Sequence, residues 1–191
     1  MFLKPLFLAF SLIFVGQAYA KQTPKAQKAR RQPITLQKLS RIIEGQCTFP
    51  EYNAFAKAFY EKGTLAGLGM TKVEGGNPFL EEYLLKKPIQ VFHRETKRLC
   101  FTSSGAMAIL EGVDAEALAK ELDLTERYRS PVKVMFAKVI EDELLEFEES
   151  SLKMRKLIRL NVSTVTTHPG CVLAGCEYRL ETQEEPLGLD R

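Results

Sequence analysis

Histidine and cysteine side chains near the C-terminus form the pattern in this chain that most resembles a metal site. His168, Cys171 and Cys176 have the spacing His-x2-Cys-x4-Cys. Zinc needs four protein ligands in structural sites, or three plus water in catalytic ones. The spacing is not that of a standard zinc finger, and His93 is the one further histidine in the sequence. We therefore expect neither a metal nor another cofactor.

Ser103, Ser104 and His93 contain the groups of a serine hydrolase, provided that a carboxylate stands nearby. A serine nucleophile needs a base within hydrogen-bond reach and an oxyanion hole. Ser104-Gly105 lacks the Gly-x-Ser-x-Gly pattern of a nucleophile elbow. His93 falls in a predicted strand, where a hydrogen-bonded structural histidine is the usual case. The sequence therefore identifies no catalytic residue.

Four cysteines are present: Cys47, Cys100, Cys171 and Cys176. In an exported chain an even number of cysteines indicates disulfide bonds, and spacing alone leaves three pairings open. We predict Cys47–Cys176 and Cys100–Cys171. Cys176 shares the parity of the core-facing residues of its strand, and Cys47 lies between two helices that should pack on that layer. The other two cysteines then pair.

A basic stripe is predicted on one strand, because Lys153, Arg155 and Arg159 share one parity while most apolar residues take the other. Such alternation places the basic side chains on the outer face of the strand. One hypothesis is that the stripe binds an acidic partner, with its field raising the association rate. The hypothesis that we favour is pairing with the acidic run Glu141–Glu149 across a hairpin.

The periodicity of apolar residues places most helices early in the chain and most strands late. Thr35 and Asp114 are the expected N-caps of two helices. The predicted helices cover 36–44, 50–62, 78–85 and 115–122. The predicted strands cover 64–74, 89–94, 99–102, 106–110, 132–140, 152–162 and 172–180. This order favours an α+β fold with N-terminal helices packed on a largely antiparallel sheet in a single domain.

The first twenty residues have the layout of a secretory signal peptide. Lys4 precedes the apolar run Leu6–Val15, and Ala18 and Ala20 form a small-residue cleavage site. A membrane span needs about 20 apolar residues, so we predict no transmembrane segment in the mature chain. The expected location is periplasmic or secreted.

The remaining chain is expected to form one domain with two flanking segments. Residues 21–33 are basic and rich in small or polar residues, which favours a flexible linker over an electrostatic tether. Residues 34–183 are the predicted domain, and residues 184–191 a disordered tail. The formal charge of +3 falls to +2 when Lys4 is removed. So small a charge argues against a nucleic-acid partner.

These observations favour an exported soluble protein that binds a protein or a cell-envelope component without catalysing a reaction. The alternative is a hydrolase acting on an envelope polymer, with His93 or His168 as base. A pocket that holds either histidine beside a carboxylate or serine would favour the hydrolase. A sheet face with exposed charge would favour binding.

Overall fold

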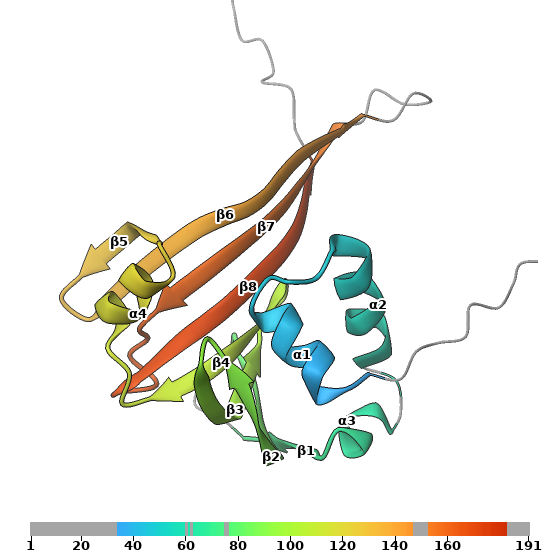
Figure 1. Cartoon of the computed structure of the whole chain (residues 1–191), viewed down its shortest axis with the longest axis horizontal. Coiled ribbons are helices and arrows are strands. Elements are labelled where there is room, and N and C mark those ends of the chain that lie inside the picture. Colours follow the sequence, from blue (N-terminus) through green and yellow to red (C-terminus); the bar gives the residue numbers. More distant parts are fainter. Residues whose placement is uncertain (1–33, 60, 62, 75–76, 147–152, 183–191) are drawn as a thin grey trace, which may run out of the picture. The chain divides into compact units, whose positions relative to one another are not determined.

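The computed structural model describes residues 34–59, 61, 63–74, 77–146 and 153–182. All of them belong to one compact unit, Pro33–Arg191. The fold is α+β, with short helices packed on an eight-stranded antiparallel sheet (Figure 1). The predicted signal peptide, the basic linker 21–33 and the C-terminal tail 184–191 lie outside the described residues.

The sheet has the strand order β1-β2-β3-β4-β8-β7-β6-β5. The helices are α1 (Leu36–Ile43), α2 (Phe49–Phe59), α3 (Thr64–Gly67) and α4 (Ala115–Glu121). The strands are β1 (Met70–Val73), β2 (Glu81–Val91), β3 (Arg94–Phe101), β4 (Gly105–Glu111), β5 (Thr125–Ser130), β6 (Lys133–Glu146), β7 (Lys153–Ser163) and β8 (Cys171–Thr182). The long strands β6, β7 and β8 therefore lie side by side, and β5 is an edge strand next to β6.

Two helices begin at the caps that the sequence predicts. The hydroxyl of Thr35 accepts a hydrogen bond from the backbone N–H of Lys38 at 3.1 Å. The carboxylate of Asp114 accepts from the N–H of Ala117 at 2.7 Å. Each bond satisfies a backbone donor that the first turn of a helix leaves without a partner.

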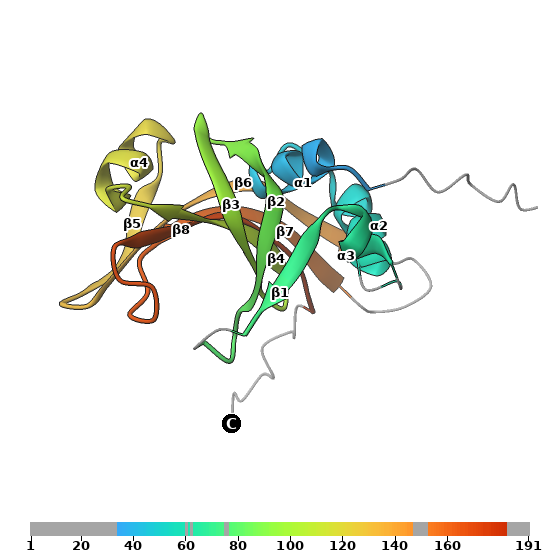
Figure 2. The same cartoon turned by 90° about the horizontal axis from the view of Figure 1, so that it is seen from below.

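The sheet has two distinct faces. The helix face carries residues such as Leu99, Ala108 and Ala174, which lie in register across β3, β4 and β8 and belong to the main core. Figure 2 shows the helices on one side of the sheet. The opposite face, here called the loop face, carries a smaller buried cluster of Cys100, Met107, Ile109 and Leu173, against which Leu80, Val165 and Cys171 pack.

Aromatic rings fill the helix face where α1 and α2 meet the sheet. Tyr52 stacks on Tyr178 with ring centroids 4.2 Å apart. The hydroxyl of Tyr178 donates to the carbonyl of Ile42 at 2.9 Å, which satisfies the buried phenol and ties α1 to β8. Phe59 and Phe101 also pack together, with centroids 4.3 Å apart.

Two glycines allow β4 and β8 to approach closely, at the position where β2 and β3 run at a steep angle to β6, β7 and β8 (Figures 1 and 2). A Cβ on Gly105 would lie 2.3 Å from the carbonyl oxygen of Cys176, and one on Gly175 would lie 2.3 Å from that of Ala106. Neither position has space for a side chain. The close pairing of β4 with β8 therefore depends on both glycines.

Several predicted elements are wrong in type or boundary. The predicted helix 78–85 is instead a turn followed by β2, and the predicted strand 64–74 is divided into α3 and β1. The turn between the predicted strands 89–94 and 99–102 lies earlier than those bounds imply, at Phe92 and His93. Both residues have positive φ, as a two-residue hairpin turn requires. Phe92 is buried in the main core, and its N–H donates to Glu44 at 2.7 Å. These tertiary contacts fix the turn at this position.

Candidate binding surface

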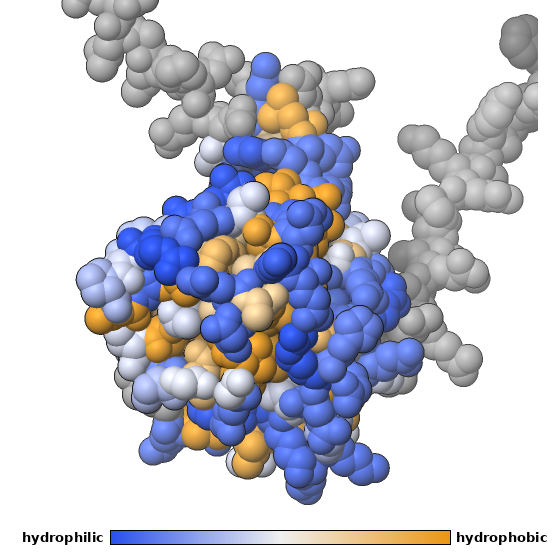
Figure 3. All heavy atoms as spheres, turned by 60° about the vertical axis from the view of Figure 1, so that its left-hand side comes forward, coloured by the Kyte–Doolittle hydropathy of each residue, from blue (hydrophilic) through white to orange (hydrophobic). Residues whose placement is uncertain are grey.

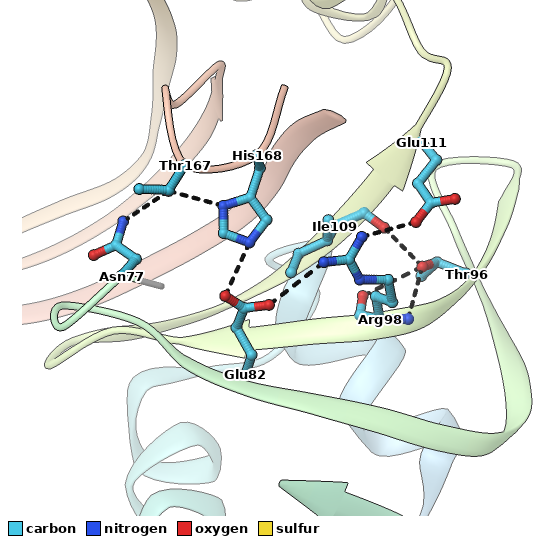
Figure 4. Close-up of polar contacts among 8 residues, drawn as sticks. All are labelled: Asn77, Glu82, Thr96, Arg98, Ile109, Glu111, Thr167 and His168. Carbon is cyan, nitrogen blue, oxygen red and sulfur yellow. Dashed lines mark hydrogen bonds and ion pairs between the residues drawn. The ribbon is translucent and has the colours of Figure 1, made fainter. Parts of the chain in front are cut away.

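A polar network with a buried centre at His168 and Glu82 joins three separate segments on the loop face (Figure 4). Nε2 of His168 lies 2.9 Å from a carboxylate oxygen of Glu82, and Nδ1 lies 2.9 Å from the hydroxyl of Thr167. The side-chain amide of Asn77 donates to the same hydroxyl at 3.2 Å. The network therefore connects the β7–β8 loop to β2 and to the turn before it.

Arg98 extends the network toward the far end of β3. Its guanidinium donates to Glu111 at 2.8 Å and lies 3.5 Å from the second carboxylate oxygen of Glu82. The hydroxyl of Thr96 donates to the carbonyl of Ile109 at 2.8 Å and accepts from the N–H of Arg98 at 3.0 Å. Both oxygens of Glu82 therefore face a partner.

The His168–Glu82 pair is a histidine beside a carboxylate, as the hydrolase alternative requires, but it is buried. His168 is 6% exposed and Glu82 is 4% exposed. Both imidazole nitrogens already have a partner. Cys100, which faces Glu82 across β2 and β3, is fully buried, and burial raises the pKa of its thiol to about 12. This arrangement suits a structural connection better than proton transfer to a substrate.

The other predicted nucleophile set is not brought together. His93 lies at the turn before β3, whereas Ser103 and Ser104 lie in the turn after it. A strand of this length separates its ends by about 25 Å, at roughly 3.3 Å per residue. No hydrogen bond can connect the histidine and either serine across that distance.

The two cysteines of the metal-like spacing lie on different sides of the sheet. Cys176 belongs to the core of the helix face, while Cys171 packs against the cluster on the loop face. Among the described residues, no group of three or more His, Cys, Asp or Glu side chains could hold a metal ion. His168 is instead engaged by Glu82 and Thr167.

The four cysteines have free thiols in the structure. Cys100 on β3 lies opposite Met107 on β4, and Met107 lies opposite Gly175 on β8. Cys171 is therefore two strands away from Cys100 and four residues along β8 from the position level with it. These steps place their Cα atoms about 16 Å apart, well beyond the limit of about 7 Å for a disulfide. The register therefore does not accommodate Cys100–Cys171.

Cys47–Cys176 stays a prediction. Both residues are buried in the main core. A Cβ on Gly45, two residues before Cys47, would lie 2.7 Å from the sulfur of Cys176. The α1–α2 connection thus passes directly over Cys176.

The basic residues on β7 already have acidic neighbours. Arg155 donates two hydrogen bonds to Asp142, at 2.7 and 2.5 Å, and this contact lowers the pKa of the aspartate. Arg159 donates to Glu177 on β8 at 2.6 Å. Lys153 lies opposite Glu146 in the β6–β7 register. Arg155 therefore has a partner in the acidic run, as the favoured hypothesis expects, while Arg159 takes a partner from β8.

The described part of the acidic run, Glu141–Glu146, forms the second half of β6. Glu141–Glu146 pairs with Lys153–Ile158 of β7, whose next neighbour is β8. We call these parts of β6 and β7, with Tyr178–Thr182 of β8, the arm; it extends past the helices in Figure 1. Lys156 forms ion pairs with both Glu141 and Glu143, which raise the pKa of its ammonium group.

One edge of β6 lacks a neighbouring strand among the described residues. β5 pairs only with Lys133–Ala137, and no described strand pairs with the outer edge from Lys138 to Glu146. A register shift between Val139 and Glu141 leaves Ile140 as a bulge. The segment Glu141–Glu146 beyond the bulge is regularly paired with β7 on its inner side. We call Lys138–Glu146 the free edge.

Large apolar side chains are exposed along the free edge. Val139 is 42% exposed, Ile140 45% and Leu144 47%. Figure 3 shows the molecule from the side that carries α4 and β5. Apolar surface is exposed there, with hydrophilic surface on both sides of it. Within the part of the chain that the structure describes, the free edge thus combines a strand edge that has no neighbouring strand with apolar side chains whose burial would be favourable.

Sequence reasoning missed the free edge because it ended the predicted strand at Ile140 and did not predict β5. Alternation continues through the acids, since Asp142 and Leu144 share the loop face while Glu141 and Glu143 share the helix face. Reading that alternation as a strand would have extended the predicted strand to Glu146. It would not have shown that β5 covers only the first residues of β6.

Comparison with known proteins returns no match, either to a protein-family model, to a curated protein or to a solved structure. Among the described residues, no helix is long and apolar enough to cross a membrane.

Proposed function

We propose that this protein is an exported, non-enzymatic binding module that docks an extended segment of a partner protein or envelope component along the free edge of β6. The observation that carries the proposal is the coincidence, on one segment, of an unpaired strand edge with three exposed aliphatic side chains. Export rests on the signal-like residues 1–20 of the sequence.

Strand addition suits this edge for a simple physical reason. An edge strand presents backbone N–H and C=O groups that a second extended chain can bond. In such complexes main-chain hydrogen bonds provide affinity, and alternate side chains provide specificity. The segment Glu141–Glu146 spans about 20 Å at roughly 3.3 Å per residue, which is the usual length of a protein strand.

Two other surfaces support a function less well. The arginines of the basic stripe, Arg155 and Arg159, already bond carboxylates, so the stripe has little charge left for an acidic partner. The hydrolase alternative has the His168–Glu82 pair in its favour, but both members are buried and engaged.

Crosslinking in the exporting cell tests the proposal. A photoreactive phenylalanine analogue at Leu144 should give a discrete adduct, and peptide mapping should find the adduct in one extended segment of one partner. The matched control carries the same probe at Leu84, which is 46% exposed against 47% for Leu144 but lies on β2. Equal adducts from both positions would indicate unspecific contact, and no adduct from Leu144 would contradict docking at the free edge.

A further inference from the structure

Resting on the proposed function, we infer that the segment docked on the free edge alternates basic and aliphatic residues. The inference uses the side chains that flank the edge, because residues opposite each other on neighbouring strands share a face of the sheet. The chemistry of each face of β6 then predicts the chemistry of every second residue of the partner.

The helix face of the arm has more acidic than basic groups near the free edge. Glu141 and Glu143 both lie there, and Lys156 bridges them. Lys138, at the start of the edge on the same face, is engaged by Asp123 at 2.8 Å. The side chain of Glu143 remains 53% exposed. One positive charge between two negative ones leaves an excess that a lysine or arginine of an added strand can neutralise at short range.

The loop face of the same edge offers apolar contact instead. Leu144 and Val139 are both about half exposed there. Asp142, which lies between them, is already engaged by two hydrogen bonds from Arg155. Aliphatic residues of an added strand would remove this apolar surface from water, at about 25 cal/mol per Å² buried.

A second copy of the chain fits the edge poorly. Antiparallel pairing of two copies around Asp142 sets Glu141 of one copy opposite Glu143 of the other, and pairing around Glu143 sets that residue against itself. Like charges directly opposite each other are destabilising.

Three synthetic ten-residue peptides test the inference on the purified full chain. The first alternates lysine and valine, the second glutamate and valine, and the third lysine and serine. At low salt we expect the lysine–valine peptide to bind about ten-fold more tightly than either of the others. It should also slow amide exchange in Glu141–Glu146. Glu143→Gln should reduce the difference in affinity between the lysine–valine and glutamate–valine peptides. The control is Glu116→Gln, on α4, where the side chain is 62% exposed; it should leave that difference unchanged.

The outcomes separate this inference from the proposed function. If the glutamate–valine peptide protects the free edge equally well, the charge preference is wrong while strand addition stands. If the lysine–valine peptide protects a different segment, docking at the free edge is wrong. No binding of any peptide overturns the inference. If the chain dimerises with rising concentration and Leu144→Lys abolishes the dimer, the edge binds a second copy instead. If the free edge is protected from amide exchange in the full chain and loses that protection when residues 1–33 are removed, the edge binds the chain's own basic segment.

Discussion

Replacing Gly175 by alanine is expected to lower the free energy of unfolding by about 3 kcal/mol, at the upper end of the usual cost of overpacking. The new Cβ would lie 2.3 Å from the carbonyl oxygen of Ala106 and 2.7 Å from the Cα of Met107. Both obstructing atoms belong to the backbone of β4, so no side-chain rotation relieves the contact. Urea unfolding followed by circular dichroism measures the change.

The control for this substitution is Gly67→Ala. Gly67 lies in α3, and no heavy atom lies within 4 Å of the position that its Cβ would take. Alanine there should be neutral or raise stability by up to about 1 kcal/mol, because glycine is the poorer helix former. A Gly175 variant as stable as the Gly67 variant would contradict the close approach of β4 and β8.

Replacing His168 by alanine should cost about 3 kcal/mol of unfolding free energy, because it leaves a buried carboxylate without its nearest partner. Glu82 would keep only Arg98, at 3.5 Å. The substitution should also increase the rate at which a protease cleaves the β7–β8 loop, since His168 ties that loop to β2. Chemical unfolding and limited proteolysis measure the two effects.

His93→Asn serves as the matched control, because His93 is exposed and asparagine tolerates its φ of +58°. It should change stability by less than about 0.5 kcal/mol. Replacing Glu82 by leucine in the His168→Ala protein should recover part of the loss, since the buried charge is then removed. A His168→Ala protein of unchanged stability that lost a hydrolytic activity would instead make the pair catalytic.

The local signals in the sequence predict those parts of the fold that local chemistry determines. Thr35 and Asp114 are short polar residues before apolar periodic segments, and both cap helices as predicted. The alternation in β7 and β8 is strict enough to predict which side chains face the helices. The α+β class follows from the order of these elements.

The errors arise where distant contacts outweigh local preference. Asn77-Pro78 is a plausible helix start, yet the side chain of Asn77 accepts from the N–H of Phe79 in a turn and donates to Thr167, ninety residues away. Residues 81–85 then pair with β1 and β3. No pattern within residues 77–85 reveals those partners.

The candidate site could not be read from the sequence for the same reason. The sequence predicts that the acidic run pairs with the basic stripe, but it does not show which edge of that strand has no neighbour. The free edge exists because β5 begins at Thr125, opposite Ala137, while β6 continues to Glu146. Which strand ends first is a property of the assembled sheet. The exposure of Val139, Ile140 and Leu144 follows from that difference in length.

Residue-resolved amide exchange of the isolated protein shows whether the outer edge of β6 is open to a partner. In an edge strand alternate N–H groups point inward to the neighbour and outward to solvent. Within Glu141–Glu146 we predict slow exchange for the amides that face β7, and exchange close to that of an unstructured chain for those that face outward. Slow exchange of both sets would mean that the outer edge of β6 is already covered, and this would contradict the docking of a partner strand there.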